Sequence, residues 1–460
     1  MISTTFDRAH RSQLERNIRT PCMRLAAALS LSALLLSVPN ASAFDWRDGH
    51  DNNWVATWGA SPQSGVEPIF GPPPAPTIFN DQTVRMIARI SRGGDRVRVR
   101  LDNSFGTDSV VIGAARVAKH GVGAAIEPGS DRALKFGGSP VITIPPGGSV
   151  VSDPVRLSIS DLTELTVSIY PPKPTPALSV HTLGVQTAYI SAVGAGNLTG
   201  AATIPAPTTT LVRYFLSGIE VRAHDDARAI VTFGDSITDG FNSTVDANRR
   251  WPDRLAERLL DRRSSADLSV VNEGISGNRL LHTVIGPNVL SRFDRDVIAQ
   301  TNVAFVIVLV GINDIGFSAI QVPGSPFAAQ AVTAEEMIQA YRQLITRAHL
   351  KDIKIIGGTL LPFEGAGYFS QEGEVKRQAV NDFIRNSGEF DDVVDFDRVM
   401  RDPSHPTRLL PLYDSGDHLH PNDAGYEAMA KAVDLRMFQH VFGNRGAVEI
   451  LDYAQFARVQ

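Results

Sequence analysis

The chain has 460 residues, of which 43% are hydrophobic and 20% are charged, and its formal net charge is −5. This composition is ordinary for a globular protein, and the length favours more than one domain. The acidic balance and the lack of a Lys/Arg cluster argue against a nucleic-acid-binding protein.

The first 43 residues predict a secretory signal peptide. An apolar run over residues 25–38 follows Met23 and ends before Ala41-Ser42-Ala43, a small-residue pattern at which signal peptides are cleaved. The region before the run is basic, with Arg8, Arg11, Arg16, Arg19 and Arg24. A membrane anchor is the alternative, but a run of about 14 residues is short for a membrane span. We therefore expect cleavage after Ala43 and a secreted or periplasmic protein with no stable membrane insertion.

Cysteine usage fits this expectation. The single cysteine, Cys22, would be removed with the signal peptide. The mature protein would then have no disulfide, no thiol nucleophile and no cysteine-bound metal. A chain of this size buries enough surface to fold without disulfides.

Residues 44–222 predict an all-β domain that resembles a sandwich or jelly roll. In residues 96–101, arginine alternates with aliphatic residues, so Val97, Val99 and Leu101 should share a buried face while the three arginines face solvent. Further strands are expected over residues 110–117, 141–144, 155–159 and 165–169, separated by Gly, Pro, Ser and Asp.

The start of this region has its own signals. The segment Trp54-Val-Ala-Thr-Trp58 predicts a strand, and the proline-rich residues 71–76 predict a surface loop. We expect the two tryptophans to pack in the core or between domains, and a platform for stacking sugars is the alternative.

Residues 223–460 predict an α/β domain, because strand-like runs alternate with helical ones. The expected strands span residues 229–233, 268–272, 303–310, 353–359 and 393–396. The expected helices span residues 251–262, 292–300, 334–349, 371–387 and 423–441. Pro252, and Thr333 with Glu336 as a capping box, support two of the helix starts. The alternation favours a doubly wound parallel sheet with helices on both faces.

Four loops of this domain carry unusual polar residues. They read GDSITDG at residues 234–240, NEGISGNR at 272–279, GIND at 311–314 and DSGDHLHPN at 414–422. The first three follow successive strands, and the carboxyl ends of parallel strands lie at one edge of a sheet. We therefore expect these loops to converge there.

The residue types at this edge suit acyl transfer through a serine. Ser236 can be a nucleophile with His420 as its general base, and Asp417, three residues before His420, can orient the imidazole. The backbone N–H groups of Ser236 and Gly277 and the side-chain amide of Asn313 can form an oxyanion hole. At Gly277 no side chain would block a substrate. Taken alone, a Gly-Asp-Ser turn is also typical of ordinary turns and helix caps.

Together the four blocks resemble the SGNH (GDSL-type) serine esterases and acylhydrolases, a family named for the Ser, Gly, Asn and His of its sequence blocks. The matching residues are Ser236 in GDSIT, Gly277 in NEGISGN, Asn313 in GIND, and Asp417 and His420 in DHLH. The resemblance covers roughly residues 227–445, a typical domain length. It implies a flavodoxin-like three-layer α/β/α fold and ester hydrolysis without a metal or a cofactor.

The layout is also similar to a secreted subgroup of this family, the esterases encoded beside xylan-degrading enzymes. That similarity rests on the Trp-Val-Ala-Thr-Trp opening, the β-rich region and the Asp-His-Leu-His-Pro-Asn ending. It implies a small-molecule or polysaccharide ester as the substrate, with short-chain or acetyl esters of carbohydrates favoured. A lipid acylhydrolase and a glycan-binding protein on an esterase scaffold are the alternatives.

Several local alternatives stay open at the fourth loop. His418 could be the base, although its neighbour Asp417 is poorly placed to orient it, and Asp414 could replace Asp417 as the orienting carboxylate. Asp417, His418 and His420 could also bind a metal ion, but no further ligand cluster supports this.

Other polar residues have structural explanations. Asp235 is expected to bond loop amides, although it could tune the serine, and His282 is expected to be a packed or surface residue. Asn422 or Asp423 should cap the last helix. The chain has no Gly-x-Ser-x-Gly nucleophile elbow and, in its α/β half, no Gly-x-Gly-x-x-Gly or Walker loop, so competing hydrolase and nucleotide-binding classes lack support.

Overall fold

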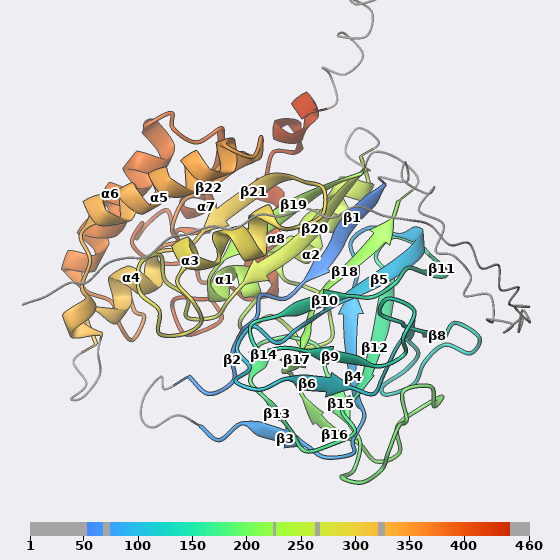
Figure 1. The fold of residues 1–460 in the computed structure, drawn as a ribbon. Coiled ribbons are helices and arrows are strands. Elements are labelled where there is room, and N and C mark those ends of the chain that lie inside the picture. The colour runs from blue at the N-terminus through green and yellow to red at the C-terminus, as the bar shows by residue number, and fades with distance from the viewer. Residues whose placement is uncertain (1–52, 68–73, 224–226, 263–266, 321–326, 442–460) are drawn as a thin grey trace, which may run out of the picture. The chain divides into compact units, whose positions relative to one another are not determined.

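The computed structural model describes residues 53–67, 74–223, 227–262, 267–320 and 327–441 (Figure 1). The predicted signal peptide at residues 1–43 lies outside these ranges, as do residues 71–73 of the proline-rich stretch. Among the described residues, no helix is both long enough and apolar enough to cross a lipid bilayer.

The C-terminal part is built on a parallel sheet. In spatial order its strands are β20 (Leu268–Gly274), β19 (Arg228–Gly234), β21 (Val303–Leu309), β22 (Lys354–Gly358) and β23 (Asp392–Val394). Counted along the chain, this is the order 2-1-3-4-5 of flavodoxin-like folds. All the predicted strands are present, and the predicted α/β fold class is confirmed.

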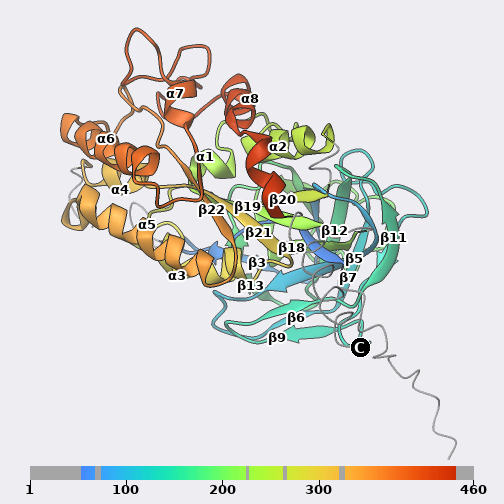
Figure 2. The same cartoon turned by 90° about the horizontal axis from the view of Figure 1, so that it is seen from above.

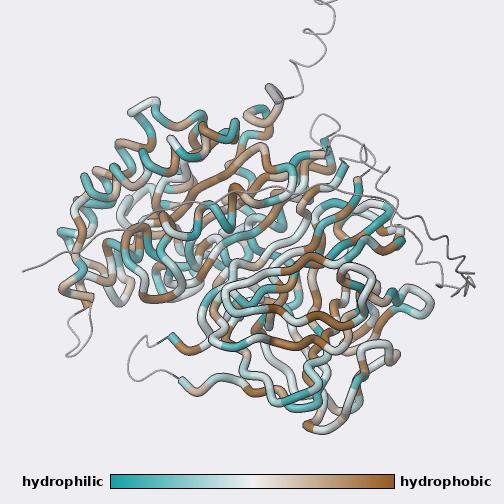
Figure 3. Tube along the Cα trace, viewed as in Figure 1, coloured by the Kyte–Doolittle hydropathy of each residue, from teal (hydrophilic) through white to brown (hydrophobic). Residues whose placement is uncertain are grey.

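Helices cover both faces of this sheet. They are α1 (Ser236–Asp239), α2 (Trp251–Leu260), α3 (Val289–Phe293), α4 (Ile312–Phe317), α5 (Ala334–His349), α6 (Gln371–Asn386), α7 (Phe396–Met400) and α8 (Asp423–Ala432). Helices α2 and α7 pack on α8, whereas α3 and α6 pack on α5, and the two groups lie on opposite faces (Figure 2). Because both faces are covered, strands such as β21 are apolar along their whole length (Figure 3).

Two of the predicted helices are interrupted. The helix expected over residues 423–441 ends at Ala432, and a 3₁₀ segment, η5 (Leu435–Val441), follows. The break occurs where the side chain of Asp434 accepts a hydrogen bond from the backbone N–H of Arg436, which starts a new turn. The helix expected over residues 292–300 is the end of α3 followed by a π-helical turn, η3 (Asp294–Ile298).

The N-terminal part is β-rich and antiparallel, as predicted. One sheet joins β1 (Trp54–Gly59), β18 (Leu216–Arg222), β5 (Gly94–Asp102) and β10 (Ser149–Val151), with β11 (Val155–Ile159) also paired to β5. A second sheet joins β16 (Thr208–Thr210), β15 (Ala188–Ile190), β4 (Val84–Arg89), β12 (Glu164–Tyr170), β7 (Ala114–Lys119) and β8 (Arg132–Ala133).

Shorter strands complete this β-rich part. They are β2 (Gln63–Ser64), β3 (Thr77–Phe79), β6 (Val110–Ile112), β9 (Ile142–Ile144), β13 (Thr175–Ala177), β14 (Ser179–His181) and β17 (Arg213–Tyr214). The single strand expected over residues 110–117 is therefore two strands, β6 and β7, which belong to different sheets and are separated at Gly113.

Strand β5 shows what the alternating pattern could predict. Val97, Val99 and Leu101 are fully buried, as expected. The arginines between them do not simply face solvent, because Arg98 and Arg100 both pair with Glu220 of β18, whose side chain is only 3% exposed. The alternating pattern of β5 could not reveal this buried carboxylate, because it belongs to a neighbouring strand. The face of β5 that was expected to be solvated is therefore ion-paired.

The β-rich part docks along β20, the edge strand of the parallel sheet. Ser91 Oγ lies 2.9 Å from both the backbone N and the backbone O of Val270. Ser269 Oγ donates to the carbonyl of Ala56 at 2.6 Å. Both parts belong to one compact unit, residues 51–460. The predicted boundary between residues 222 and 223 falls between β18 and β19.

Candidate active site

Three loops meet at the carboxyl edge of the parallel sheet. Gly234, the last residue of β19, is level with Gly274 of β20 on one side and with Leu309 of β21 on the other. The backbone N–H of Ile275 donates to the carbonyl of Gly234 at 3.1 Å, which joins the first two loops directly. The expected convergence is therefore present.

Ser236 is held in a tight turn at this edge. It is the first residue of α1, which Asp235 caps by accepting a hydrogen bond from the N–H of Ile237 at 3.0 Å. A Cβ atom on Gly234 would lie 2.3 Å from both the carbonyl oxygen of Leu309 and Oγ1 of Thr238, so only glycine fits before the turn. Burial raises the pKa of Asp235 to about 7.

Ser236, His420 and Asp417 form one chain of hydrogen bonds. Ser236 Oγ lies 2.8 Å from Nε2 of His420, and Nδ1 of His420 lies 2.7 Å from Oδ2 of Asp417. Because a carboxylate only accepts, Nδ1 carries the proton and Nε2 is left to accept from the serine hydroxyl. The structure thus joins the three residues that the sequence singled out for serine chemistry.

The Asp417 carboxylate accepts several hydrogen bonds. Its partners are the N–H groups of Leu419 and His420, the imidazole of His420, the amide of Asn242 and the hydroxyl of Ser415. Partial burial alone would raise the pKa of Asp417, but the hydrogen bonds from the side chain and backbone of His420 outweigh it and hold that pKa below its ordinary value. The carboxylate therefore stays ionised beside the imidazole.

The two alternative residues at this loop, His418 and Asp414, form a hydrogen-bonded pair of their own. His418 Nδ1 lies 2.6 Å from Oδ2 of Asp414, and the His418 side chain is 53% exposed. Asp414 thus orients His418, and His420 is the imidazole that meets Ser236. In the ranges that the structure describes, no group of three His, Cys, Asp or Glu side chains is placed to hold a metal ion.

Two backbone N–H groups of these loops, those of Ser236 and Gly277, are without an acceptor among the residues that the structure describes. Gly277 has a φ of 78°, which favours glycine. A Cβ atom there would also lie 2.5 Å from Cδ1 of Ile285. The absence of a side chain at Gly277 is therefore needed for the packing of Ile285, and the expectation that it also leaves a substrate unblocked stays a prediction.

The amide of Asn313 is fixed from both ends. Its Nδ2 donates to the carbonyl of Asn278 at 3.0 Å, and its Oδ1 accepts from the hydroxyl of Tyr368 at 3.2 Å. The second N–H of the amide is left for another acceptor. Asn313 thus lies against the loop that carries Gly277, the neighbour of Asn278.

Buried charges hold that loop in place. Arg292 donates to the carbonyl of Gly234 at 2.8 Å and to Oδ1 of Asn278 at 2.9 Å. Asp314 accepts from the N–H of Leu280 at 2.7 Å, and burial raises its pKa to about 6. The loop with Gly277 is therefore tied to the first and third loops by side chains that are almost fully buried.

Sequence reasoning missed three neighbours of this site. The Phe241 ring lies 4.6 Å from the His420 ring and is partly exposed, Asn242 reaches Asp417, and Tyr368 reaches Asn313. Asn242 comes two residues after the GDSITDG block, and Tyr368 lies in the loop after β22, whose carboxyl end is at the same edge. That topology was the available signal, since none of these residue types stands out alone.

Residues with predicted structural roles lie outside this hydrogen-bond chain. Asn422 caps α8 by accepting from the N–H of Gly425, whereas Asp423 accepts from Thr244. His282 lines a cavity beside α5, and burial lowers its pKa.

The chain is similar to one known protein family and to several solved structures. Residues 232–428 match the model of the GDSL-like lipase/acylhydrolase family. None of the curated proteins that were compared matches the chain. Similar solved structures include a GDSL-like lipase from Bacteroides thetaiotaomicron, an acetylxylan esterase from Geobacillus stearothermophilus and an alpha/beta hydrolase from the metagenome of Lake Arreo, Spain. Their identities are 21%, 23% and 24%, with TM-scores of 0.34, 0.35 and 0.35. Each alignment covers 46% of this chain and, in the same order, 89%, 93% and 97% of the other.

Proposed function

We propose that the protein is a serine esterase, on the premise that residues 232–428 form a GDSL-like lipase/acylhydrolase domain. The observation that carries the proposal is the hydrogen-bond chain from Ser236 through His420 to Asp417. The backbone N–H groups of Ser236 and Gly277, which have no acceptor among the described residues, add to it. These are the parts that acyl transfer needs: a nucleophile, a base, a group that orients the base, and donors for the oxyanion.

In the acylation step, Ser236 Oγ attacks the ester carbonyl carbon while Nε2 of His420 takes the hydroxyl proton. Asp417, ionised at neutral pH, holds the Nδ1–H tautomer and stabilises the imidazolium that forms. The imidazolium then gives its proton to the leaving alkoxide, and the alcohol departs. Ser236 is left as an acyl ester.

The oxyanion hole is proposed to consist of the N–H groups of Ser236 and Gly277 and the free N–H of the Asn313 amide. Each such donor contributes roughly 3–4 kcal/mol to the transition state in serine hydrolases.

Water then attacks the acyl-enzyme with His420 again as the base, and the carboxylic acid is released. Apart from the substrate and this water, the groups that take part in each step belong to this chain.

We propose short acyl groups, acetyl first, as the substrate class, and carbohydrates as the alcohol. Bulky residues beside the oxyanion donors support a short acyl group. Ile285 fills the space next to Gly277, and the Tyr368 ring packs so closely on α4 that a Cβ on Gly316 would lie 2.4 Å from it. The β-rich layout supports a carbohydrate alcohol through its similarity to esterases encoded beside xylan-degrading enzymes. Secretion or export to the periplasm is proposed from the N-terminal sequence.

The test compares hydrolysis of p-nitrophenyl acetate by the purified wild type and by Ser236→Ala. We expect kcat to fall by at least about a thousandfold, because the nucleophile is lost. Ser404→Ala, which changes an exposed serine elsewhere in the α/β part, is the control and should keep full activity. Equal rates for wild type and Ser236→Ala would reject the proposal.

The acyl and alcohol groups need a second measurement. A series of nitrophenyl esters of increasing chain length should show kcat/KM falling beyond short acyl groups, and acetylated xylan should release acetate. A preference for long chains would instead point to a lipid acylhydrolase.

A further inference from the structure

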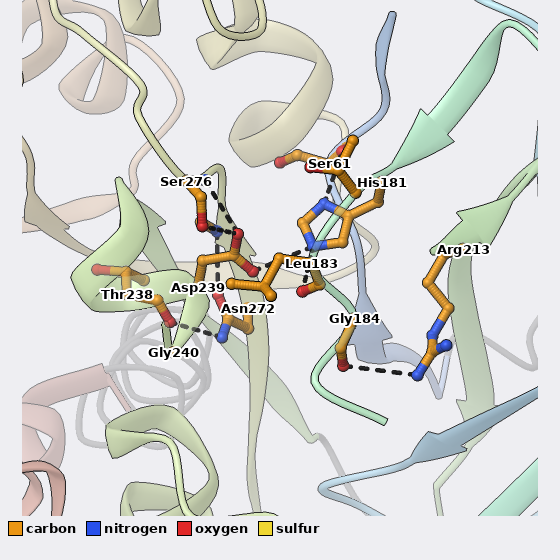
Figure 4. Close-up of polar contacts among 12 residues, drawn as sticks. Ser61, His181, Leu183, Gly184, Arg213, Thr238, Asp239, Gly240, Asn272 and Ser276 are labelled. Carbon is orange, nitrogen blue, oxygen red and sulfur yellow. Dashed lines mark hydrogen bonds and ion pairs between the residues drawn. The ribbon is translucent and has the colours of Figure 1, made fainter. Parts of the chain in front are cut away.

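The β-rich part reaches the candidate active site through one buried histidine. His181, at the end of β14, places Nε2 3.1 Å from Oδ1 of Asp239, the last residue of α1 (Figure 4). The two side chains are 5% and 2% exposed. Ser236 begins the same single-turn helix that Asp239 ends.

Every polar neighbour of the His181 ring is an acceptor. Nδ1 faces the carbonyl of Ser61 at 3.1 Å, and Nε2 faces both Asp239 and the carbonyl of Leu183 at 3.1 Å. With its proton on Nε2, the ring donates to the Asp239 carboxylate. His181 and Asp239 are therefore joined by a buried hydrogen bond between the β-rich part and α1.

The other oxygen of Asp239 holds the second loop. Oδ2 accepts from the backbone N–H of Ser276 at 2.9 Å and from its hydroxyl at 2.8 Å (Figure 4). Ser276 directly precedes Gly277. The backbone at the end of β20 also lies close to that of α1, since a Cβ on Gly274 would lie 2.3 Å from the N atom of Asp239.

We propose that His181 is a positioning residue for the proposed esterase. It fixes Asp239, and through Asp239 the Ser276–Gly277 peptide, so that the Gly277 N–H keeps its place relative to Ser236. This inference rests on the proposed function. It makes the β-rich part a support of the oxyanion hole and not a separable module, as preorganised sites depend on the residues behind them.

Packing alone is a weaker account of this pair. A buried polar pair of this kind gives no reliable gain in stability over apolar residues of the same volume. A second histidine, His120, pairs with Glu164 at 2.8 Å and with the carbonyl of Gly123 at 2.9 Å. Glu164 also accepts from Asn248, in the loop before α2, but in the described part of the chain neither His120 nor Glu164 has a hydrogen bond to α1. His120→Ala is therefore a control for the loss of a histidine–carboxylate pair that does not contact α1.

The test compares His181→Ala and His120→Ala in the full chain, with kcat and KM measured on p-nitrophenyl acetate. We expect His181→Ala to lower kcat by about tenfold to a hundredfold with little change in KM, because a displaced catalytic donor acts on the transition state. His120→Ala should leave both constants close to wild type. His181→Gln, which can still donate to Asp239, should recover part of kcat and carries the test if His181→Ala does not fold. An equal loss of kcat in the two alanine variants would overturn the proposal.

Hydrogen exchange provides a readout that does not need activity. Backbone amides in residues 274–279 should exchange faster in His181→Ala, or in His181→Gln, than in wild type, and should be unchanged in His120→Ala. Unchanged exchange in the His181 variants would overturn the positioning role whether or not the protein is an esterase. A wild type inactive on all esters would reject the proposed function, while faster exchange would still support the link.

Discussion

Asn242 is the residue outside the four sequence blocks that touches the Asp417 carboxylate. Its Nδ2 donates to Oδ2 of Asp417 at 3.0 Å, the same oxygen that accepts from His420. Its φ of 65° is tolerated by asparagine and glycine. The residue therefore combines a turn conformation with a contact to the carboxylate that orients His420.

We expect Asn242→Gly to lower kcat by roughly tenfold, about the effect of one lost hydrogen bond to a charged group. Glycine keeps the backbone unstrained, so the change tests the amide alone. The measurement is kcat on p-nitrophenyl acetate, with Asn302→Gly as the control, since Asn302 also has a positive φ of 60° but lies at the far end of the sheet. Full activity in Asn242→Gly would show that Asp417 needs no support from this side.

Tyr368 offers a change of one atom beside Asn313, a proposed oxyanion donor. Tyr368→Phe keeps the ring that packs on α4 but removes the hydroxyl that fixes Asn313. We expect kcat to fall by about tenfold with KM nearly unchanged, because a loosened Asn313 amide affects mainly the transition state. Tyr170→Phe, which removes a hydroxyl bound to Asp81 in the β-rich part, should have no effect on kcat.

Asp235 predicts a pH dependence of stability. Its pKa is about 7 in the folded protein against an ordinary value of 3.8, because the carboxyl is buried. Between these values the folded state keeps a proton that the unfolded chain releases, so the free energy of unfolding falls as the pH rises from about 4 to about 7. Urea unfolding at about pH 5 and about pH 8 should show this loss, and Asp235→Asn should shrink it. Part of the pH difference should remain in this variant, because the pKa of Asp314 is also raised, to about 6. An undiminished pH difference in the variant would contradict the assignment to Asp235.

Among the residues of the candidate site, the sequence predicted those that lie within a recognisable motif. Ser236, Asp417 and His420 could be found because each belongs to a recognisable block. Asn242 and Tyr368 could not, because their contacts depend on where the loops lie in three dimensions. Gly277 could be singled out by its block, but the packing of Ile285 against it could not be predicted, because it depends on the fold of the loop.

At the scale of elements, helix α5 tests how a capping box contributes. Thr333 Oγ1 accepts from the N–H of Glu336 at 3.2 Å, and the Thr333 N–H donates to the Glu336 carboxylate at 2.7 Å. Thr333→Ala should lower the free energy of unfolding by about 1 kcal/mol, with kcat unchanged. The measurement is urea denaturation, and Thr346→Ala in the same helix is the control. An equal loss in both variants would contradict a specific role for the cap.

The success of prediction differed between the two parts of the chain. The strands and long helices of the α/β part were predicted because each is strongly apolar or clearly periodic. The β-rich part contains strands of two or three residues, such as β2, β14 and β17, which are too short to show alternation. The partners of these strands lie far away in the sequence. The sequence could therefore predict an all-β class but not which strands pair in each sheet.

At the scale of the whole molecule, the two parts should depend on each other. Ser61 of the β-rich part donates to the buried Glu273 of β20 at 2.7 Å, and Arg292 donates to Ser61 at 3.0 Å. Removing the β-rich part would leave Glu273 and Arg292 without this partner. We expect residues 223–460 expressed alone to unfold at lower urea concentration and to lose the proposed esterase activity. A truncated chain with wild-type stability and kcat would contradict this dependence.

The serine contacts along β20 have a consequence for how these molecules behave when crowded. The outer edge of an exposed strand offers unpaired N–H and C=O groups to which another chain can add a strand. Here the hydroxyl of Ser91 lies against both backbone groups of Val270, so that position is closed by a side chain in place of a neighbouring strand. The opposite edge is β23, a strand of only three residues. The parallel sheet is thus protected at both borders against edge-to-edge aggregation, and this protection matters most at high protein concentration and during refolding.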